Sequence, residues 1–236
     1  MFGTGKWANL IGLKLRSNGI TPLFVGGNNA DYTRDNLSHL LDCGCPIFIA
    51  SSTEDHYKDL VKSISLNPSV IFVEKGFANC EQKQQAKSIV TNIPVYILSQ
   101  YRYSEVFDYL LSLNDKINKC YYNWTIEKGK ISEWAHHIIS IDNYIKKTDN
   151  QLDITLPGKY VLDDISECYI NFGEERSLRI DIVTDNYQFN ISLGKTSNKI
   201  YVDIENTTLE FNEDCLKTEI DNVLQHNITN TKLERL

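Results

Sequence analysis

The chain has 236 residues, of which 42% are hydrophobic and 23% are charged, the composition of an ordinary globular protein. Its net charge of −7 disfavours nucleic acid as a partner, because phosphate contacts need clustered cations. Apolar runs such as 47–50 and 70–73 are far shorter than the roughly 18 to 20 residues that cross a bilayer. We therefore expect neither a nucleic acid partner nor a membrane span.

The first residues, Met1 to Lys6, lack the basic and apolar regions of a secretory signal, so we expect a cytoplasmic protein. Six cysteines are too few for a disulfide scaffold. Cys43 and Cys45 are separated by one residue, which is not the spacing of a zinc knuckle or a redox motif. We expect reduced thiols and no metal site.

The first hundred residues alternate helical and strand-like segments. Apolar residues at helical spacing predict a first helix, which ends at Asn18-Gly19. Short apolar runs predict strands buried on both faces of a parallel sheet. The expected helices are 7–18, 35–41, 54–65 and 81–90, and the expected strands are 20–25, 46–50, 69–73 and 95–98.

Beyond Tyr103 the pattern changes. We expect helices at 103–113, 131–146 and 213–225, a strand at 119–125, and alternating strands within 159–211, such as 177–183 and 187–193. The prediction is an α/β fold with a Rossmann-like parallel sheet in an N-terminal dinucleotide-binding domain, 1–100. A reduced C-terminal α+β domain, 101–236, would contain an antiparallel sheet and serve the substrate or oligomerisation.

The segment Gly3-Thr4-Gly5-Lys6-Trp7-Ala8 fits the pattern G-x-G-x-x-G/A, in which glycines allow a tight turn and a close approach to a pyrophosphate. A glycine-rich start to an ordinary helix is an equal alternative for this hexapeptide alone. Only Met1 and Phe2 precede Gly3, so the strand that should feed the turn is nearly absent. At the end of the second strand, Gly26-Gly27 replaces the acid that binds the ribose. Asn28, Asn29 or Arg34 either contact the ribose or a 2′-phosphate or simply form the turn.

Three further segments follow strands or open a helix at the expected edge of the sheet. They are Ile49 to His56, Val73 to Gly76, and Gln100-Tyr101-Arg102-Tyr103, and a fourth segment, Glu133 to His137, lies in a predicted helix. Together with the glycine motif they resemble, in order, the motifs G-x-G-x-x-A, I-A-T-P-x-x-x-H, V-E-K-P, N-x-R-F and D-x-G-x-H of the Gfo/Idh/MocA family of NAD(P)-dependent oxidoreductases. The resemblance covers roughly residues 1 to 145.

The chain departs from the family pattern at four positions. Ser52 and Gly76 replace prolines, Gln100 replaces asparagine, and Glu133 replaces aspartate. Gly76 matters most, because glycine loosens the turn that holds the preceding lysine. The C-terminal part is also shorter than the family's usual second domain.

The resemblance implies NAD or NADP as the cofactor. The implied cofactor contacts are Gly3, Thr4, Gly5, Lys6, Trp7, Ser51, Ser52, His56, Glu74, Lys75 and Arg102. Lys6 could neutralise phosphate charge, although it could equally be an exposed first-turn residue. For Arg102 and Tyr103 a role in pocket shape is favoured over catalysis.

Lys75 and His137 are the implied catalytic pair. A lysine beside a cationic nicotinamide has its charged form disfavoured, so it could exchange a proton with a substrate hydroxyl. An imidazole suits the companion acid–base work at neutral pH. The alternatives are a solvated Lys75 paired with Glu74, and a His137 that is satisfied on a buried helix face or paired with Glu133.

The leading interpretation is an NAD(P)-dependent oxidoreductase acting on a hydroxyl-bearing carbon, of a sugar or sugar nucleotide as the resemblance implies. A second interpretation is a related binding or regulatory module that has lost catalysis. A third is a plain α/β protein with accidental motifs. An exposed face of the C-terminal sheet would also allow a homodimer.

Overall fold

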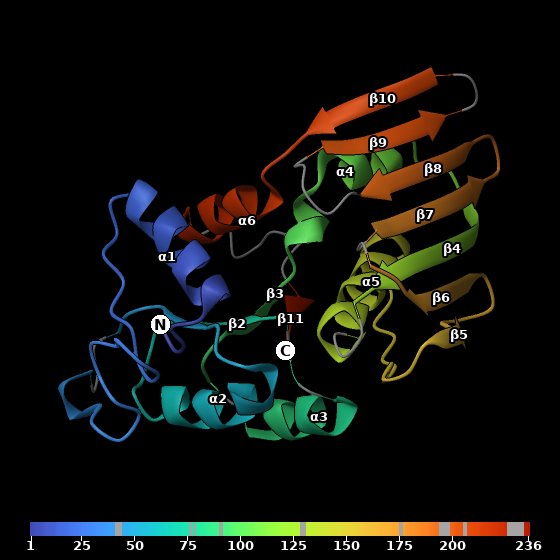
Figure 1. Cartoon of the computed structure of the whole chain (residues 1–236). Helices are drawn as coiled ribbons and strands as arrows, with labels where there is room; N and C mark the ends of the chain where they lie inside the picture. Colours follow the sequence, from blue (N-terminus) through green and yellow to red (C-terminus); the bar gives the residue numbers. More distant parts are fainter. Residues whose placement is uncertain are drawn as a thin grey trace. The chain divides into compact units, whose positions relative to one another are not determined.

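The computed structural model describes residues 1–40, 44–75, 77, 79–89, 92–127, 131–174, 177–193, 199–204, 207–225 and 234–236. The chain forms two compact units, Met1–Ser99 with Leu216–Leu236, and Gln100–Cys215 (Figure 1). Residues 216–236, predicted as part of the second domain, belong to the first unit. The physical reason is long-range pairing, which no local pattern encodes.

Hydrogen bonds of α6 and of the last strand hold the end of the chain in the first unit. In helix α6 (Cys215–Leu224), the buried carboxylate of Glu219 accepts a hydrogen bond from the backbone N–H of Ser99 at 2.6 Å. Strand β11 (Glu234–Arg235) then pairs antiparallel with β3 (Val95–Leu98).

The sheet of the first unit has the order β1-β2-β3-β11, with β1 (Ile47–Ile49), β2 (Ile71–Glu74) and β3 parallel. Every residue of these three strands except Glu74 is buried, as the apolar runs predicted. Helices α1 (Lys6–Ser17) and α6 lie on one side of the sheet, and α2 (His56–Ile64) and α3 (Cys80–Ile89) lie on the other (Figure 1). This arrangement confirms the Rossmann-like α/β prediction for the N-terminal part.

Helix α1 (Lys6–Ser17) forms where the sequence predicted it. Its buried residues, Ala8, Ile11, Gly12 and Leu15, recur every three or four positions and form one face. Gly19 ends the helix in the left-handed conformation (φ 76°), which glycine adopts without steric cost, and its N–H donates to the carbonyl of Arg16.

Two predicted elements are shorter than expected. The segment 20–25 forms bridges only at Val25, with Phe2 and Tyr32, because the strand beside it contains just Met1 and Phe2. The predicted helix 35–41 is a single 3-10 turn, Ser38–Leu40, within the described residues. Such a turn needs no continuous apolar face, and Leu37 is buried next to it.

The second unit contains a seven-stranded sheet of order β10-β9-β8-β7-β4-β6-β5. Its strands are β4 (Ile117–Ile126), β5 (Gly158–Val161), β6 (Ser166–Phe172), β7 (Ser177–Thr184), β8 (Gln188–Leu193), β9 (Lys199–Ile204) and β10 (Thr207–Asn212). The sequence predicted an antiparallel sheet, but β4 and β6 are parallel, so the sheet is mixed. The crossover between them contains α5 (Ile131–Lys146), and a crossover of this kind returns the chain in the same direction.

Helix α5 packs against β4 and β6, and a buried polar cluster attaches it there. The carboxylate of Asp142 accepts hydrogen bonds from Tyr122 on β4 at 2.9 Å and from Ser166 on β6 at 2.8 Å. Its second oxygen lies 2.6 Å from the ammonium of Lys146, one helical turn further on. Since each buried charge in this cluster has a partner, α5 is held in one position on the sheet.

The unit begins with a 3-10 turn, η3 (Gln100–Tyr103), which leads into α4 (Glu105–Ser112). The side chain of Ser104 caps α4 by accepting from the N–H of Val106. Among the residues that the structure describes, no helix is long and apolar enough to cross a membrane. The same residues contain no cluster of three or more metal-ligating side chains.

Candidate functional site

The glycine motif forms a tight loop between the Met1–Phe2 strand and α1. Gly3 has φ 104°, and a Cβ placed there would lie 2.5 Å from the carbonyl oxygen of Ala50 at the end of β1. Gly27 has φ 89°, and its Cβ would lie 2.3 Å from Oγ1 of Thr4. Only glycine fits at either position, so three segments meet closely at the carboxyl edge of the sheet.

The amino end of α1 opens from this loop. Gly5 is the N-cap residue and has no side chain with which to satisfy the first N–H groups of the helix. Apart from Gly5 and its neighbours along the chain, no atom of the described residues lies within 4 Å of the position of a Gly5 Cβ, and the first turn of the helix contains no acidic residue. The partial positive charge of a twelve-residue helix therefore faces open space beside Lys6. These residues fit the pyrophosphate of a dinucleotide.

The loop after β1 contains the next three predicted contacts. The hydroxyl of Ser51 is buried and has no hydrogen-bond partner among the described residues. Ser52 donates to Asp55 at 2.9 Å and is exposed. His56 is fully buried, with Nε2 3.1 Å from the carbonyl oxygen of Ser51. Of these three side chains, the hydroxyl of Ser51 is the one that could donate to a ligand. His56 instead contacts the backbone of the loop from the protein interior.

Lys75 lies at the end of β2, where its backbone adopts the left-handed conformation (φ 53°). Its N–H donates to the carbonyl of Leu98 on β3 at 3.3 Å. Its ammonium is 4.5 Å from the ring centroid of Trp7 and 3.5 Å from Oε1 of Glu74. The side chain is only 6% exposed, so Lys75 is buried rather than solvated, whereas the pairing with Glu74 that the alternative interpretation predicted is present. Gly76, the altered position of the motif, lies outside the described residues.

Trp7 thus connects the glycine loop with Lys75. A cation over an indole face is attracted by the ring quadrupole, more strongly where water is excluded. The structure brings together Gly3, Thr4, Gly5, Trp7 and Lys75 at one edge of one sheet. The cation–π contact could not be predicted from the sequence, because Trp7 and Lys75 are 68 positions apart in the chain.

Arg34, near the turn after residues 20–25, forms an ion pair with the buried carboxylate of Asp59. Its Nε and Nη2 donate to the two carboxylate oxygens of Asp59 at 2.7 and 2.9 Å, and these hydrogen bonds raise the pKa of Arg34 above its ordinary value. The guanidinium also lies against Gly26, whose Cβ would be 3.0 Å from it. The predicted choice between a ribose contact and a turn residue stays open, but the arginine has a structural partner that sequence reasoning missed.

The remaining predicted residues belong to the second unit. His137 on α5 is 1% exposed and forms an edge contact with Tyr101 of η3, with ring centroids 5.0 Å apart. The indole of Trp124 on β4 lies 6.3 Å from its ring. His137 therefore lies in an aromatic environment, and the side chain of Glu133, its alternative partner, is outside the described part of the structure.

Arg102 is buried rather than a surface arginine. Its Nε donates to Oγ and O of Ser140 on α5, at 2.7 and 3.1 Å, and its guanidinium lies 6.0 Å from the ring centroid of Tyr144. These contacts join η3 to α5, the element that also contains His137. The role of Arg102 in pocket shape stays a prediction.

Comparisons with known proteins give fold-level similarity only. No protein-family model and no curated protein sequence matches the chain. The 3-ketoreductase KijD10 from Actinomadura kijaniata, solved with TDP-benzene and NADP, superposes with a TM-score of 0.74 at 10% identity, over 97% of this chain and 88% of that one. The UDP-N-acetylglucosamine 3-dehydrogenase GnnA from Acidithiobacillus ferrooxidans gives 0.70 at 11% identity, over 97% and 87%.

The WlbA dehydrogenase from Thermus thermophilus, solved with NAD and UDP-GlcNAcA, gives a TM-score of 0.59 at 14% identity, over 95% of this chain and 86% of that one. At these identities the comparisons establish the fold. The chain has the Rossmann-like dehydrogenase fold of these structures.

Proposed function

We propose that the protein is an NAD(P)-dependent oxidoreductase that transfers a hydride between the nicotinamide and a hydroxyl-bearing carbon of a sugar or sugar nucleotide. One observation carries the proposal. The uncapped end of α1 opens from a glycine loop at the carboxyl edge of the sheet, and the same loop contacts a buried lysine through Trp7. Fold neighbours solved with NADP and TDP-benzene, or with NAD and UDP-GlcNAcA, support the cofactor and the substrate class.

In this proposal the first unit holds the dinucleotide. The N–H groups at the start of α1 would bind the pyrophosphate, with Lys6 neutralising part of its charge. The hydroxyl of Ser51 would donate to the cofactor, which gives this buried group the partner it needs. When bound, the cofactor supplies the hydride chemistry.

Lys75 and His137 would move the proton. The Nζ of Lys75 would donate to, or accept from, the oxygen of the substrate carbon that changes oxidation state. Trp7 and Glu74 hold that ammonium in place, since they contact it at 4.5 and 3.5 Å. His137 would act as the companion acid or base, and Tyr101 fixes the orientation of its imidazole ring.

Two substitutions test the catalytic assignment. Lys75→Ala and His137→Gln should each lower turnover by roughly 10² to 10⁴ while dinucleotide affinity changes little, because each removes a proton-transfer group. Turnover is followed by the absorbance of reduced nicotinamide in a screen of UDP- and TDP-sugars. Lys58→Ala is the matched control, since Lys58 is 77% exposed on α2 and should leave turnover unchanged. Unchanged turnover in both site variants would show that Lys75 and His137 are not the proton-transfer groups.

A related binding module without catalysis is the second candidate. The turn after residues 20–25 favours it, because Gly26 and Gly27 offer no carboxylate to a ribose and Arg34 is already bound to Asp59. This candidate predicts no saturable binding of NADH or NADPH up to about millimolar concentration, and no turnover of any sugar nucleotide in the same screen.

A further inference from the structure

The turn that follows residues 20–25 lies beside the glycine loop. The N–H of Gly3 donates to the carbonyl of Val25 at 2.9 Å, and Val25 forms a parallel bridge with Phe2. In a dinucleotide-binding fold, an acid at the end of this strand binds the ribose of NAD, whereas a nearby arginine accommodates the 2′-phosphate of NADP. The fold alone does not decide between the two cofactors, since one neighbour was solved with NADP and another with NAD. The side chains at this turn do decide.

Thr4 and Arg34 occupy the space in which an acid on this turn would lie. Gly26 and Gly27 have φ 73° and 89°, a backbone region that residues with a Cβ rarely adopt. A Cβ on Gly27 would lie 2.3 Å from Oγ1 of Thr4, and a Cβ on Gly26 would lie 3.0 Å from Nη1 of Arg34. A guanidinium therefore stands at the place of the ribose-binding acid.

Asp59 fixes the direction of this guanidinium. Its carboxylate is fully buried on α2 and accepts from Nε and Nη2 of Arg34, at 2.7 and 2.9 Å. These bonds use two of the five N–H donors of an arginine. Nη1 lies on the other side of the group, against Gly26. The ion pair thus orients the remaining donors in advance, which lowers the entropy cost of binding an anion.

The charges around Arg34 leave it able to bind an anion. Asp55, whose oxygen lies 3.7 Å from Nη2, also lies 3.9 Å from Nζ of Lys58. Asp35 lies 3.0 Å from Nζ of Lys62. Each of these carboxylates therefore has a lysine beside it, and Arg34 is not the cation on which their neutralisation depends. The side chain of Arg34 is 31% exposed, so a phosphate in solution can reach it.

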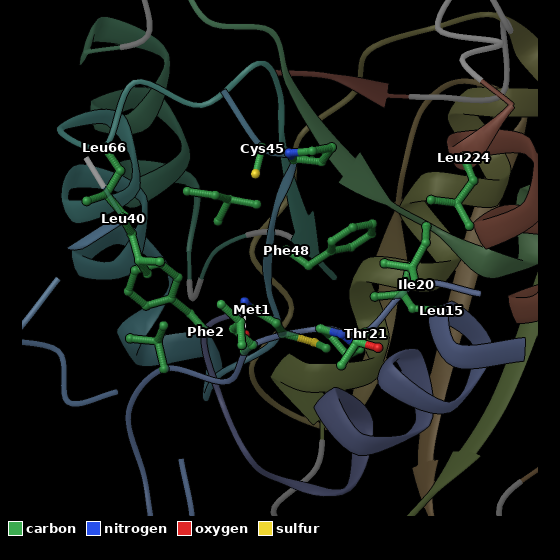
Figure 2. Close-up of a pocket in the computed structure, with 15 residues that line it drawn as sticks. Met1, Phe2, Leu15, Ile20, Thr21, Leu40, Cys45, Phe48, Leu66 and Leu224 are labelled. Atoms are coloured by element: carbon green, nitrogen blue, oxygen red, sulfur yellow. Dashed lines mark hydrogen bonds between the residues drawn. The ribbon is translucent and has the colours of Figure 1, made fainter. Parts of the chain in front are cut away.

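The opposite end of the same sheet offers nothing to a phosphate. An apolar cavity of about 290 Å³ lies there, between the chain segments 20–23 and 45–48 (Figure 2). The described side chains that line it are apolar except for Thr21 and Cys45, and none of them is charged. A phosphate that leaves water needs charge-assisted hydrogen bonds. In the first unit, the described residues supply them at the turn beside Arg34.

We propose that Arg34 makes the protein selective for NADP over NAD, by binding the 2′-phosphate of the cofactor beside Gly26 and Gly27. The inference rests on the proposed function, because it needs a dinucleotide at the glycine loop. Nη1 donates to the phosphate oxygens, and Asp59 is the positioning residue that holds the guanidinium toward them. Hydrogen bonds to a charged group of this kind raise affinity by about tenfold to a hundredfold.

Adenosine 2′,5′-bisphosphate and AMP test the inference without a nicotinamide, because they differ only in the 2′-phosphate. Isothermal titration calorimetry measures their dissociation constants together with those of NADPH and NADH. The unmodified protein should bind adenosine 2′,5′-bisphosphate at least about tenfold more tightly than AMP, and NADPH at least about tenfold more tightly than NADH.

Arg34→Met/Asp59→Leu removes the guanidinium without leaving a buried charge, so the variant should keep its fold, as far-ultraviolet circular dichroism will show. Its affinity for NADPH should fall by about tenfold to a hundredfold while its affinity for NADH stays the same. The control is Lys87→Met, which removes one positive charge from the last turn of α3 and should keep the preference for NADPH.

Gly26→Asp and Gly26→Asn form a second pair of variants with the same shape. Both strain the turn equally, since Asp and Asn are the side chains that best tolerate a positive φ. Only Asp adds a negative charge beside Arg34. Gly26→Asp should therefore bind NADPH at least about tenfold more weakly than Gly26→Asn does, and should bind NADH no more weakly.

The outcomes separate this inference from the proposed function. NADH bound as tightly as NADPH, or a preference for NADPH that persists in Arg34→Met/Asp59→Leu, would overturn the role of Arg34 and leave the proposed function standing. Equal affinities of the two Gly26 variants for NADPH would also overturn that role. Binding of neither dinucleotide up to about millimolar concentration would overturn both.

Discussion

The pair formed by Arg34 and Asp59 should respond unequally to removal of its two members. Asp59 is completely buried on α2, whereas the side chain of Arg34 is 31% exposed. Arg34 also has a second acid, Asp55, whose oxygen lies 3.7 Å from Nη2. Arg34→Ala leaves a carboxylate without its cation in the interior, while Asp59→Ala leaves a cation that water and Asp55 still reach.

The magnitudes follow from this asymmetry. Removing one partner of a buried ion pair costs about 3 to 5 kcal/mol when the remaining charge stays buried, so we expect about 3 to 4 kcal/mol for Arg34→Ala. Asp59→Ala should cost only about 1 to 2 kcal/mol, because solvent screens the remaining guanidinium. The double variant Arg34→Met/Asp59→Leu should be more stable than Arg34→Ala, because no buried charge remains in it.

Urea unfolding at neutral pH, followed by far-ultraviolet circular dichroism, measures the three free energies of unfolding. A double-mutant cycle with both alanine substitutions should give a coupling of about 1 to 2 kcal/mol. If Asp59→Ala is as destabilising as Arg34→Ala, or more so, the reasoning from the exposure of the two side chains is wrong.

Two further predictions concern titration and thiol chemistry. Burial by itself raises the pKa of Asp163, but hydrogen bonds from Lys146 and the backbone outweigh it and hold the pKa below its ordinary 3.8. The stability that Asp163 contributes is present above that value and is lost as the pH falls through the lower folded value. Asp163→Asn should therefore flatten the loss of thermal stability between about pH 5 and pH 2. Iodoacetamide at about pH 8 should alkylate exposed Cys45 and spare native Cys120, because burial raises the pKa of Cys120 to about 12, and mass spectrometry of the digested protein distinguishes the two.

Local patterns were sufficient for much of the fold. Helix α1 could be predicted because its apolar spacing and its glycine stop lie within one short stretch of sequence. The parallel strands β1, β2 and β3 could be predicted because strands buried on both faces are continuous apolar runs. Helix α5 also lies at 131–146, where the sequence predicted a helix.

Long-range pairing could not be predicted from the same patterns. Nothing in the sequence of β11 indicates that it pairs with β3, or that Glu219 accepts from Ser99. The parallel pairing of β4 with β6 likewise depends on the path of the crossover through α5. The pattern of alternating residues gives the faces of a strand but not its neighbour.

The candidate site also combines local features that the sequence predicts with long-range contacts that it does not predict. The glycine loop was predictable, because its chemistry lies in one hexapeptide. The burial of Lys75 against Trp7, and of His56 beneath the loop of Ser51, comes from tertiary packing of separate segments. The burial of Asp59 on α2, beside His56, Leu60 and Ser63, likewise comes from tertiary packing, and a charged residue buried there needs a cationic partner.

The central claim is that the glycine loop binds a dinucleotide, and titration with NADH and NADPH tests it most directly. Trp7 contacts Lys75 beside the loop, so quenching of tryptophan emission should report binding. In Trp7→Phe the quenching on binding should be smaller, because only the chain's other two tryptophans remain to emit. The account predicts saturable binding of at least one of the two cofactors below millimolar concentration. No binding of either up to about millimolar, a free energy weaker than about −4 kcal/mol, would contradict it.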